Sequence, residues 1–152
     1  MFKRLYAVLG FALLAVMLCV HQAGAKTPIA VPPIVNVVIN VSSQSMLVRV
    51  NGWPYGSWKV STARVGYHTP RGSFGVQRTA RVYFSRKYDN APMPNAVFFH
   101  YGFAIHGTYH VKYLGKPASH GCVRISPTNS AELYGLVERY GPSATKITIV
   151  DR

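Results

Sequence analysis

The residues best suited to chemistry lie around Cys122, in the run SHGCVR at positions 119–124, and a second His-Gly pair, His106-Gly107, precedes them. A thiol attacks a carbonyl group as its thiolate, and the ordinary thiol pKa of about 8.5 leaves little thiolate at neutral pH. A neighbouring imidazole can take the thiol proton and later return it to a leaving amine. The pattern therefore predicts a nucleophilic cysteine with either His106 or His120 as its base.

The neighbouring residues indicate how an acyl group would be handled. Gly107 and Gly121 allow the backbone to approach a substrate closely, and the N–H groups of Gly121 and Cys122 could form an oxyanion hole. Arg124 falls on the same side of an extended strand as Cys122, where it could clamp a carboxylate through two hydrogen bonds. Ser119 is too close to Cys122 to compete as a nucleophile, and we expect it to orient the loop.

Two other interpretations use the same residues. A lone cysteine is often an inert, buried side chain, although the flanking His-Gly pairs argue against that here. A zinc site would draw on His106, His110, His120 and Cys122. These residues lack the paired Cys or His spacing of zinc sites, so we expect no metal ion and no cofactor.

The N-terminus is typical of an export signal. Lys3 and Arg4 precede an apolar run over residues 5–20, and small residues at 23–25 (AGA) suit a cleavage site. The apolar run is short for a bilayer-spanning helix. We therefore predict a cleavable signal peptide over residues 1–25 and no stable membrane span.

The remaining chain has the size of one domain. Removal of 25 of the 152 residues leaves 127, enough to bury a core. We expect a proline-bearing linker over residues 26–33 and one catalytic domain over residues 34–152. Export to the periplasm or envelope of a bacterium is predicted, and Cys122 is then the only cysteine left, so it cannot form an internal disulfide.

The charge is strongly positive. The chain has 17 Lys and Arg against 4 Asp and Glu, a net charge of +13, which favours anionic partners. The basic residues form no tract, and an exported protein rarely meets nucleic acid, so no nucleic-acid partner is expected. The anionic cell wall and outer-membrane lipids lie in the right compartment. A solvated basic face without a specific partner is the alternative.

Most of the domain has a strand pattern. Residues 34–41 are rich in β-branched side chains, and Asn51-Gly52 between runs 46–50 and 53–61 predicts a hairpin with a type I′ turn. Further strands are predicted at residues 74–84, 96–106 and 147–150.

One helix is predicted over residues 127–140. Ser126 can cap it, Pro127 suits the first helical position, and apolar side chains recur at i, i+3, i+4 and i+7 from Leu133. Gly141 and the following proline end it. The fold class predicted is mostly β, a curved β-sandwich or partly closed barrel with one principal α-helix.

Together with residues 105–108 (IHGT), the run at 119–124 resembles the signature of the L,D-transpeptidase catalytic domain (YkuD-type). Residues 61–74 (STARVGYHTPRGSF) resemble the "ST…TPxGxF" segment of this family, and Met93-Pro94 with the apolar run into His106 resembles its pre-catalytic strand. The resemblance extends from about residue 35 to residue 150.

The resemblance implies a catalytic assignment. Cys122 would attack the amide between the L-centre of diaminopimelate and D-alanine in a peptidoglycan tetrapeptide stem. His106 would be the general acid/base, oriented by the Gly107 carbonyl. The fold implied is β-rich, with the cysteine under a mobile lid that corresponds to residues 83–101.

The resemblance also implies roles around the nucleophile. His120, Gly121 and Ser119 would shape the oxyanion site, and Arg124 would hold a donor-stem carboxylate. Sensitivity to carbapenems, which acylate the nucleophilic cysteine, is implied as well.

Several functions share this acyl-enzyme. Attack by a side-chain amine of a second stem gives a 3→3 cross-link, which is the function we expect. Attack by water makes an L,D-carboxypeptidase, and attack by a protein amine attaches an outer-membrane protein to peptidoglycan. From other classes, the alternatives are a non-catalytic cell-wall-binding module and a redox or metal-binding thiol protein.

Overall fold

The computed structural model describes residues 34–151, so the predicted signal peptide (1–25) and linker (26–33) lie outside the described residues. Strand β1 (Val35–Asn40) buries every second side chain and pairs with antiparallel β2 (Ser45–Val50). Strand β3 (Trp53–Lys59) follows a turn in which Asn51 and Gly52 have φ values of 51° and 83°. Positive φ at both positions is the type I′ geometry, and the predicted hairpin is confirmed.

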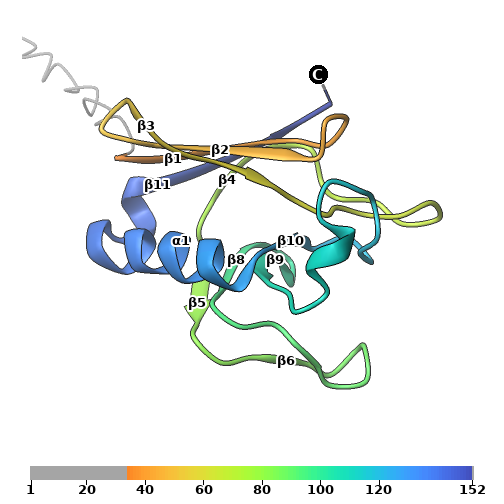
Figure 1. Ribbon diagram of the computed structural model, residues 1–152. Helices are drawn as coiled ribbons and strands as arrows, with labels where there is room; N and C mark the ends of the chain where they lie inside the picture. Colours follow the sequence, from red (N-terminus) through yellow and green to blue (C-terminus); the bar gives the residue numbers. More distant parts are fainter. Residues whose placement is uncertain (1–33, 152) are drawn as a thin grey trace, which may run out of the picture. The chain divides into compact units, whose positions relative to one another are not determined.

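The larger sheet has five strands in the order β3-β2-β1-β11-β4 (Figure 1). The C-terminal strand β11 (Thr145–Val150) lies parallel to β1, and β4 (Gly72–Gly75) pairs with its other side. The burial pattern alternates along β1 and β11, so one face of this sheet lies against the core.

The smaller sheet carries the predicted site. Its four strands are β10 (Val123–Ile125), β9 (Phe103–Gly107), β8 (Ala96–His100) and β5 (Arg78–Ala80), in that order, with β9 and β10 parallel. Two predicted strands are wrong in extent. Residues 74–84 are divided among β4 of the larger sheet, β5 of the smaller sheet and the start of a separate short hairpin. Residues 96–106 lie in the β8–β9 hairpin, which turns at Tyr101 and Gly102 with φ values of 37° and 88°.

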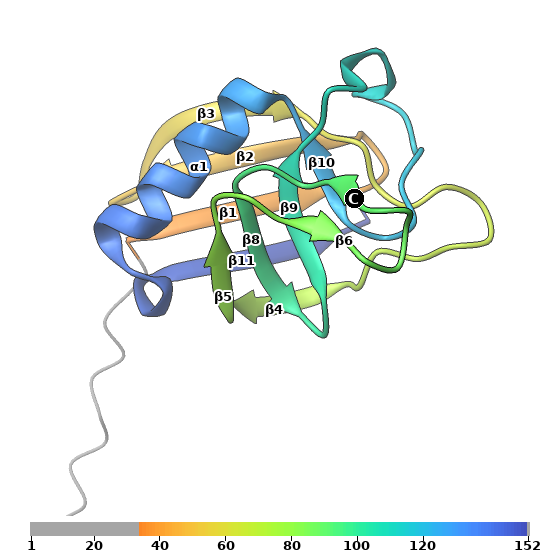
Figure 2. The same cartoon turned by 90° about the horizontal axis from the view of Figure 1, so that it is seen from below.

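The predicted helix is confirmed as α1 (Pro127–Tyr140). The Ser126 hydroxyl accepts a hydrogen bond from the Asn129 N–H, and Gly141 ends the helix with a φ of 95°. Leu133, Leu136 and Val137 of α1 are buried. The helix runs alongside the smaller sheet and beneath the larger one (Figures 1 and 2). Two short 3₁₀ turns, η1 (Val111–Tyr113) and η2 (Pro142–Ala144), complete the elements.

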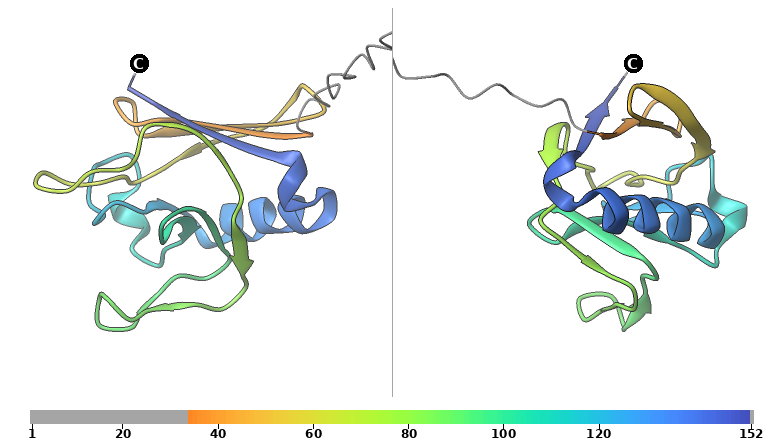
Figure 3. Two further views of the ribbon diagram at one scale, coloured as in Figure 1. Left: turned by 180° about the vertical axis from the view of Figure 1, so that it is seen from behind. Right: turned by 90° about the vertical axis from the view of Figure 1, so that its left-hand side faces the viewer.

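One segment projects from the smaller sheet. Residues 81–95, which we call the arm, carry a short hairpin of β6 (Phe84–Ser85) and β7 (Ala91–Pro92). The arm lies on the side of the smaller sheet that faces away from the larger sheet (Figures 1 and 3). Two backbone hydrogen bonds close its base, from Met93 N–H to Tyr83 O at 2.8 Å and from Asn95 N–H to Arg81 O at 2.9 Å.

The predicted fold class is confirmed. Over residues 34–151 the domain is mostly β, with two main sheets, the two-stranded β6–β7 hairpin of the arm, one principal helix and no closed barrel. The main core lies between the sheets and α1, and a second, smaller apolar cluster of Met93, Ala96, Phe98 and Ala104 lies on the far face of the smaller sheet. Within residues 34–151, no helix is both long and apolar enough to cross a bilayer.

Candidate active site

The two faces of the smaller sheet have different roles. Ile105 and Val123, which are paired, point into the main core, so their neighbours along the strands point the other way. Arg124 is paired with His106 on this outer face, and Cys122 packs against the small cluster that contains Ala104. The parallel pairing of β9 and β10 therefore brings His106, Cys122 and Arg124 to one face.

His106 is held as a neutral base. Its Nδ1 lies 2.8 Å from the Gly107 carbonyl oxygen, and because a carbonyl can only accept, Nδ1 carries the hydrogen. The lone pair is then on Nε2. The pKa of His106 is lowered to about 4, mainly by burial. The hydrogen bond to Gly107 raises this pKa, and the positive charge of Arg124 lowers it further. At neutral pH the ring is uncharged and can accept a proton.

The thiol is protonated at rest. Burial raises the pKa of Cys122, while a hydrogen bond from the Ala104 backbone and the positive charge of Arg124 act in the opposite direction. Cys122 is a free, half-buried thiol. The thiol and the imidazole on this face are therefore both uncharged at neutral pH.

Ser119 fixes the backbone that leads into the nucleophile. Its buried hydroxyl accepts a hydrogen bond from the Gly121 N–H at 2.9 Å and donates one to the Cys122 carbonyl oxygen at 2.6 Å. In this arrangement the Gly121 N–H, which the sequence offers as an oxyanion-hole donor, is engaged by the Ser119 hydroxyl. The Cys122 N–H remains the candidate donor.

Arg124 joins the two sheets at the site. Its backbone N–H donates to the Ser61 carbonyl oxygen, and its carbonyl oxygen accepts from the Ser61 N–H, both at 2.9 Å. Ser61 lies just beyond the end of β3. The half-buried guanidinium donates to the Ala118 carbonyl oxygen at 3.3 Å, and burial lowers the pKa of Arg124 from its ordinary value. The remaining N–H groups of this side chain can serve a carboxylate.

The comparison with known families decides the assignment. The family model of the L,D-transpeptidase catalytic domain, YkuD, matches residues 35–149. The chain belongs to this family.

Individual relatives agree with the YkuD family assignment. The chain is 24% identical over 132 residues to the Bacillus subtilis (strain 168) protein named as the L,D-transpeptidase YkuD, covering 83% of this chain and 71% of that one. It superimposes on an L,D-transpeptidase of Stackebrandtia nassauensis with a TM-score of 0.67 and 25% identity, covering 78% of this chain and 56% of that one.

Two further solved structures support the YkuD fold. An L,D-transpeptidase of Mycobacterium smegmatis gives a TM-score of 0.68 at 23% identity, covering 77% of this chain and 58% of the other. The transpeptidase LdtMt1, solved in complex with imipenem, gives 0.67 at 24% identity over 77% of this chain and 59% of that one. This chain therefore spans less than two thirds of the length of these solved chains.

The glycines of the YkuD motif are required by close contacts. A Cβ atom on Gly121, which has a φ of 132°, would lie 2.4 Å from the Phe103 ring. A Cβ atom on Gly107 would lie 2.5 Å from Ser130 Oγ and 3.0 Å from a Pro94 ring carbon. No larger residue fits either position without displacing these neighbours.

A buried polar network behind the catalytic loop was missed by sequence reasoning. The Thr69 hydroxyl donates to the Gly121 carbonyl oxygen at 2.8 Å. The Gln44 side chain exchanges two hydrogen bonds with Thr62, whose carbonyl in turn accepts from the Ser119 N–H. Thr69 lies in the segment that resembles the family, so the sequence could have indicated it. Gln44 is 75 positions before Ser119, and no nearby sequence pattern indicates that it supports the catalytic loop.

His120 has a different environment from His106. Its ring stacks on Tyr88 of the arm, with centroids 4.3 Å apart and planes at 10°, and meets Tyr67 edge-on at 4.7 Å. Burial lowers the pKa of His120, and the charges of Arg64, Arg124 and Lys87 lower it further. The residue that the YkuD motif places before the nucleophile is thus packed between two aromatic rings.

The zinc alternative lacks a ligand set. In the part of the chain that the structure describes, no three His, Cys, Asp or Glu side chains are arranged to hold a metal ion.

Proposed function

We propose that this domain is a peptidoglycan L,D-transpeptidase that uses Cys122 as nucleophile and His106 as general acid/base, and that it forms 3→3 cross-links. One observation carries the proposal. The neutral imidazole of His106, with Nδ1–H bound to the Gly107 carbonyl, shares a sheet face with the free thiol of Cys122. Membership of the YkuD family makes the domain an acyltransferase.

In the acylation step, the Cys122 sulfur attacks the carbonyl carbon of the amide between diaminopimelate and D-alanine. Its proton passes to Nε2 of His106 as the C–S bond forms. The Cys122 N–H stabilises the negative oxygen. The protonated His106 then gives the proton to the D-alanine nitrogen, the C–N bond breaks, and a thioester remains.

In the second step an amine takes the acyl group. The side-chain amine of a second stem attacks the thioester carbonyl carbon and gives a proton to His106. The C–S bond breaks, Cys122 leaves as the thiolate, and His106 returns the proton to the sulfur. The product is a 3→3 cross-link between two diaminopimelate residues. With water in place of the amine the same site is an L,D-carboxypeptidase, and with a protein amine it attaches an outer-membrane protein to the wall.

Charge supports an anionic peptide substrate. Arg124 lies beside the nucleophile and is suited to a stem carboxylate. The chain carries 17 Lys and Arg against 4 Asp and Glu, which favours the carboxylates of the wall over long range. Binding to isolated sacculi should therefore weaken as salt is raised, and unchanged binding would exclude this role for the charge.

Membership of the YkuD family and the N-terminal sequence support a location in the bacterial envelope. We propose that residues 1–25 are removed as a signal peptide and that residues 26–33 link it to the catalytic domain at 34–152. N-terminal sequencing of the exported protein tests this directly.

The test of the mechanism is intact-protein mass spectrometry with a carbapenem. The reduced wild-type protein should gain one covalent equivalent, and Cys122→Ala should gain none. The structural neighbour LdtMt1 was solved in complex with the carbapenem imipenem. His106→Asn should form the adduct much more slowly, since the thiol keeps its proton. A folded wild-type protein that stays unmodified would exclude the activated nucleophile and favour a non-catalytic wall-binding module.

A product assay identifies the acceptor. Tetrapeptide stems are incubated with the protein, and the products are identified by their molecular mass in mass spectrometry. Cross-linked dimers indicate transpeptidation, tripeptides indicate carboxypeptidase activity, and stems joined to an added protein indicate protein attachment.

A further inference from the structure

A groove at the end of β3 lies apart from the thiol. It has a volume of about 590 Å³ and is lined by residues 57–59 of β3, residues 43–45 where β2 begins and residues 114–116 after η1. This volume lies within the range of small-molecule sites. Neither Cys122 nor His106 is among the lining residues, so this groove, which we call the β3 groove, is separate from the catalytic face.

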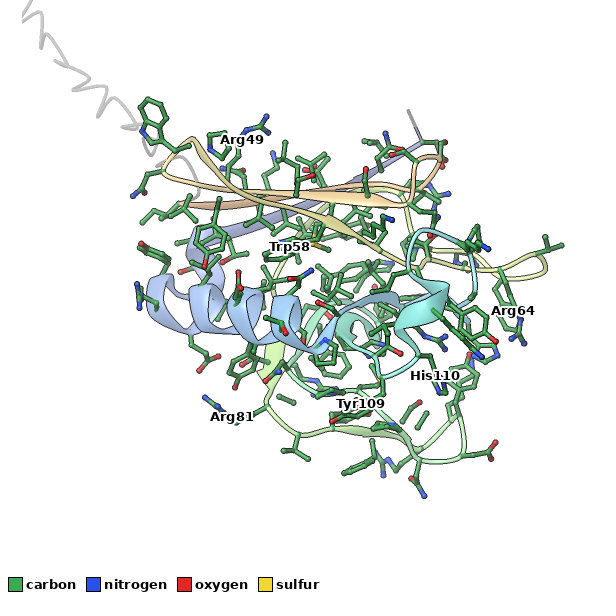
Figure 4. All side chains as sticks on the ribbon, in the orientation of Figure 1. Arg49, Trp58, Arg64, Arg81, Tyr109 and His110 are labelled. Carbon is green, nitrogen blue, oxygen red and sulfur yellow. The ribbon has the colours of Figure 1, made fainter. Side chains whose placement is uncertain are left out.

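Alternation along β3 gives the groove polar side chains. Trp58 packs against the main core and lies below the larger sheet, between that sheet and α1 (Figure 4). Ser57 and Lys59 flank Trp58 in the strand, so their side chains point to the other face. Ser45 is paired with Lys59 across the two strands and shares that face. Two hydroxyl groups and an ammonium group therefore lie together beside the groove.

Both walls of the groove are fixed to the buried residue Val60, which follows β3. The Val60 N–H donates to the Gln44 carbonyl oxygen at 2.9 Å on one wall, and the Val60 carbonyl oxygen accepts from the Gly115 N–H at 2.7 Å on the other. Ser61 Oγ donates a further hydrogen bond of 2.8 Å to the Lys116 carbonyl oxygen. The groove is therefore preformed, and a ligand does not have to order its walls.

The charge of the groove is positive and unbalanced. Lys59 and Lys116 both line it, and a Cβ atom on Gly115 would lie 3.7 Å from Lys59 Cδ, so the Lys59 stem runs along the opposite wall. No ion pair of either lysine is found within residues 34–151. The chain has four acidic residues, none of which lines the groove: Asp89, Glu132, Glu138 and Asp151. Two ammonium groups without an acidic neighbour favour an anionic ligand.

The groove is connected to the catalytic loop through Thr62. The Gln44 side chain exchanges two hydrogen bonds with Thr62, whose carbonyl oxygen accepts from the Ser119 N–H at 2.9 Å. The Ser119 hydroxyl in turn donates to the Cys122 carbonyl oxygen at 2.6 Å. A single buried residue therefore lies between one wall of the groove and the serine that positions the nucleophile.

We propose that the β3 groove binds a carboxylate of a peptidoglycan stem and so holds the wall beside the catalytic face. Lys59 and Lys116 supply the charge, and the hydroxyls of Ser45 and Ser57 bond to the amide groups next to the carboxylate. Because a wall strand carries many stems, a stem held in the groove raises the local concentration of its neighbours at Cys122. That the anion is a stem carboxylate rests on the proposed function, whereas an anion site in the groove does not.

Nuclear magnetic resonance titration of the Cys122→Ala protein tests the groove without turnover. The probe is a soluble disaccharide tetrapeptide, and the backbone N–H signals of Gly115 and Lys116 report the groove. We expect saturable shifts of both signals. Substitution of both groove lysines, Lys59→Gln with Lys116→Gln, should weaken the affinity read from the Gly115 signal by about 3- to 10-fold, the range for two exposed ion pairs lost together.

A second pair of lysines provides the matched control. Lys112 and Lys146 are exposed and lie outside the groove, so Lys112→Gln with Lys146→Gln lowers the net charge equally. This control should bind the fragment like the Cys122→Ala protein alone. Equal weakening by the two pairs of substitutions would show that only long-range charge attracts the fragment, and unshifted Gly115 and Lys116 signals would show that the groove is empty of ligand. Either result overturns the proposal.

Two further probes identify the anion. A fragment with amidated stem carboxylates should shift the Gly115 signal much less, and inorganic phosphate should bind more weakly than the free carboxylate fragment. Full binding of the amidated fragment, or tighter binding of phosphate, would overturn the stem assignment. Carbapenem acylation should be unchanged by Lys59→Gln with Lys116→Gln. Failure of acylation in the wild type would therefore count against the proposed function alone, and unshifted groove signals against the groove alone.

Discussion

Removal of the Ser119 hydroxyl should destabilise the domain markedly, although it deletes one atom. Ser119 is 1% exposed, and its hydroxyl makes hydrogen bonds of 2.9 Å with the Gly121 N–H and 2.6 Å with the Cys122 carbonyl. Each such bond contributes about 1 kcal/mol, and a buried N–H left without a partner costs about 1–3 kcal/mol. We expect Ser119→Ala to lower the free energy of unfolding by about 2–4 kcal/mol, which for a domain of this size lowers Tm by about 10 °C.

Denaturant unfolding followed by tryptophan fluorescence measures this difference. The slope of the unfolding free energy against denaturant should match that of the wild type, because the same surface is exposed. Ser43→Ala is the matched control, since its hydroxyl is exposed and bonds only to Ser45 Oγ at 2.7 Å, and it should cost less than about 0.5 kcal/mol.

The same variant should slow the reaction of the nucleophile. The freed backbone at Gly121 and Cys122 can shift, and a misplacement of about 1 Å can cost about 10²-fold in rate. Carbapenem acylation followed by mass spectrometry gives this rate. If Ser119→Ala is as stable as Ser43→Ala and acylates at the wild-type rate, Ser119 does not hold the catalytic loop.

Three further outcomes follow from the site. The folded-state pKa of His106, about 4, lies below the unfolded value of about 6.5, so the unfolded chain takes up a proton first. The contribution of His106 to the unfolding free energy should be constant above pH 7 and fall by about 3 kcal/mol between pH 6.5 and 4, and His106→Asn should lack this contribution. Gly107→Ala places a Cβ 2.5 Å from Ser130 Oγ, and we expect a Tm lower by at least about 5 °C with slower carbapenem acylation. Arg71→Ala removes an exposed ion pair with Asp151 at 2.7 Å and should leave Tm unchanged in a thermal melt. A clearly lower Tm would show that this ion pair stabilises the domain more than its exposure implies.

Local elements were predictable because their causes are local. The Asn51-Gly52 turn and the 127–140 helix each follow from residues within one turn of the chain, and both have the predicted form. The β8–β9 turn was missed because Tyr101 takes a positive φ, which tyrosine seldom does in isolation. The cross-strand pairing on either side of the turn imposes that conformation.

The sequence by itself determined which groups are available at the site. It identified the Cys122 thiol with two imidazoles, a guanidinium and two glycines close by in the sequence. Residue types and spacing are enough to select these groups, and their motifs resemble those of the YkuD family, whose model matches residues 35–149.

Only the tertiary structure decided what those groups do. Parallel pairing of β9 and β10 places His106 on the sheet face that carries Cys122, and burial fixes its neutral state. The Ser119 hydroxyl engages the Gly121 N–H, and the arm supplies Tyr88 to His120. Each outcome depends on burial or on contacts between distant segments, and neither can be calculated from neighbours along the chain.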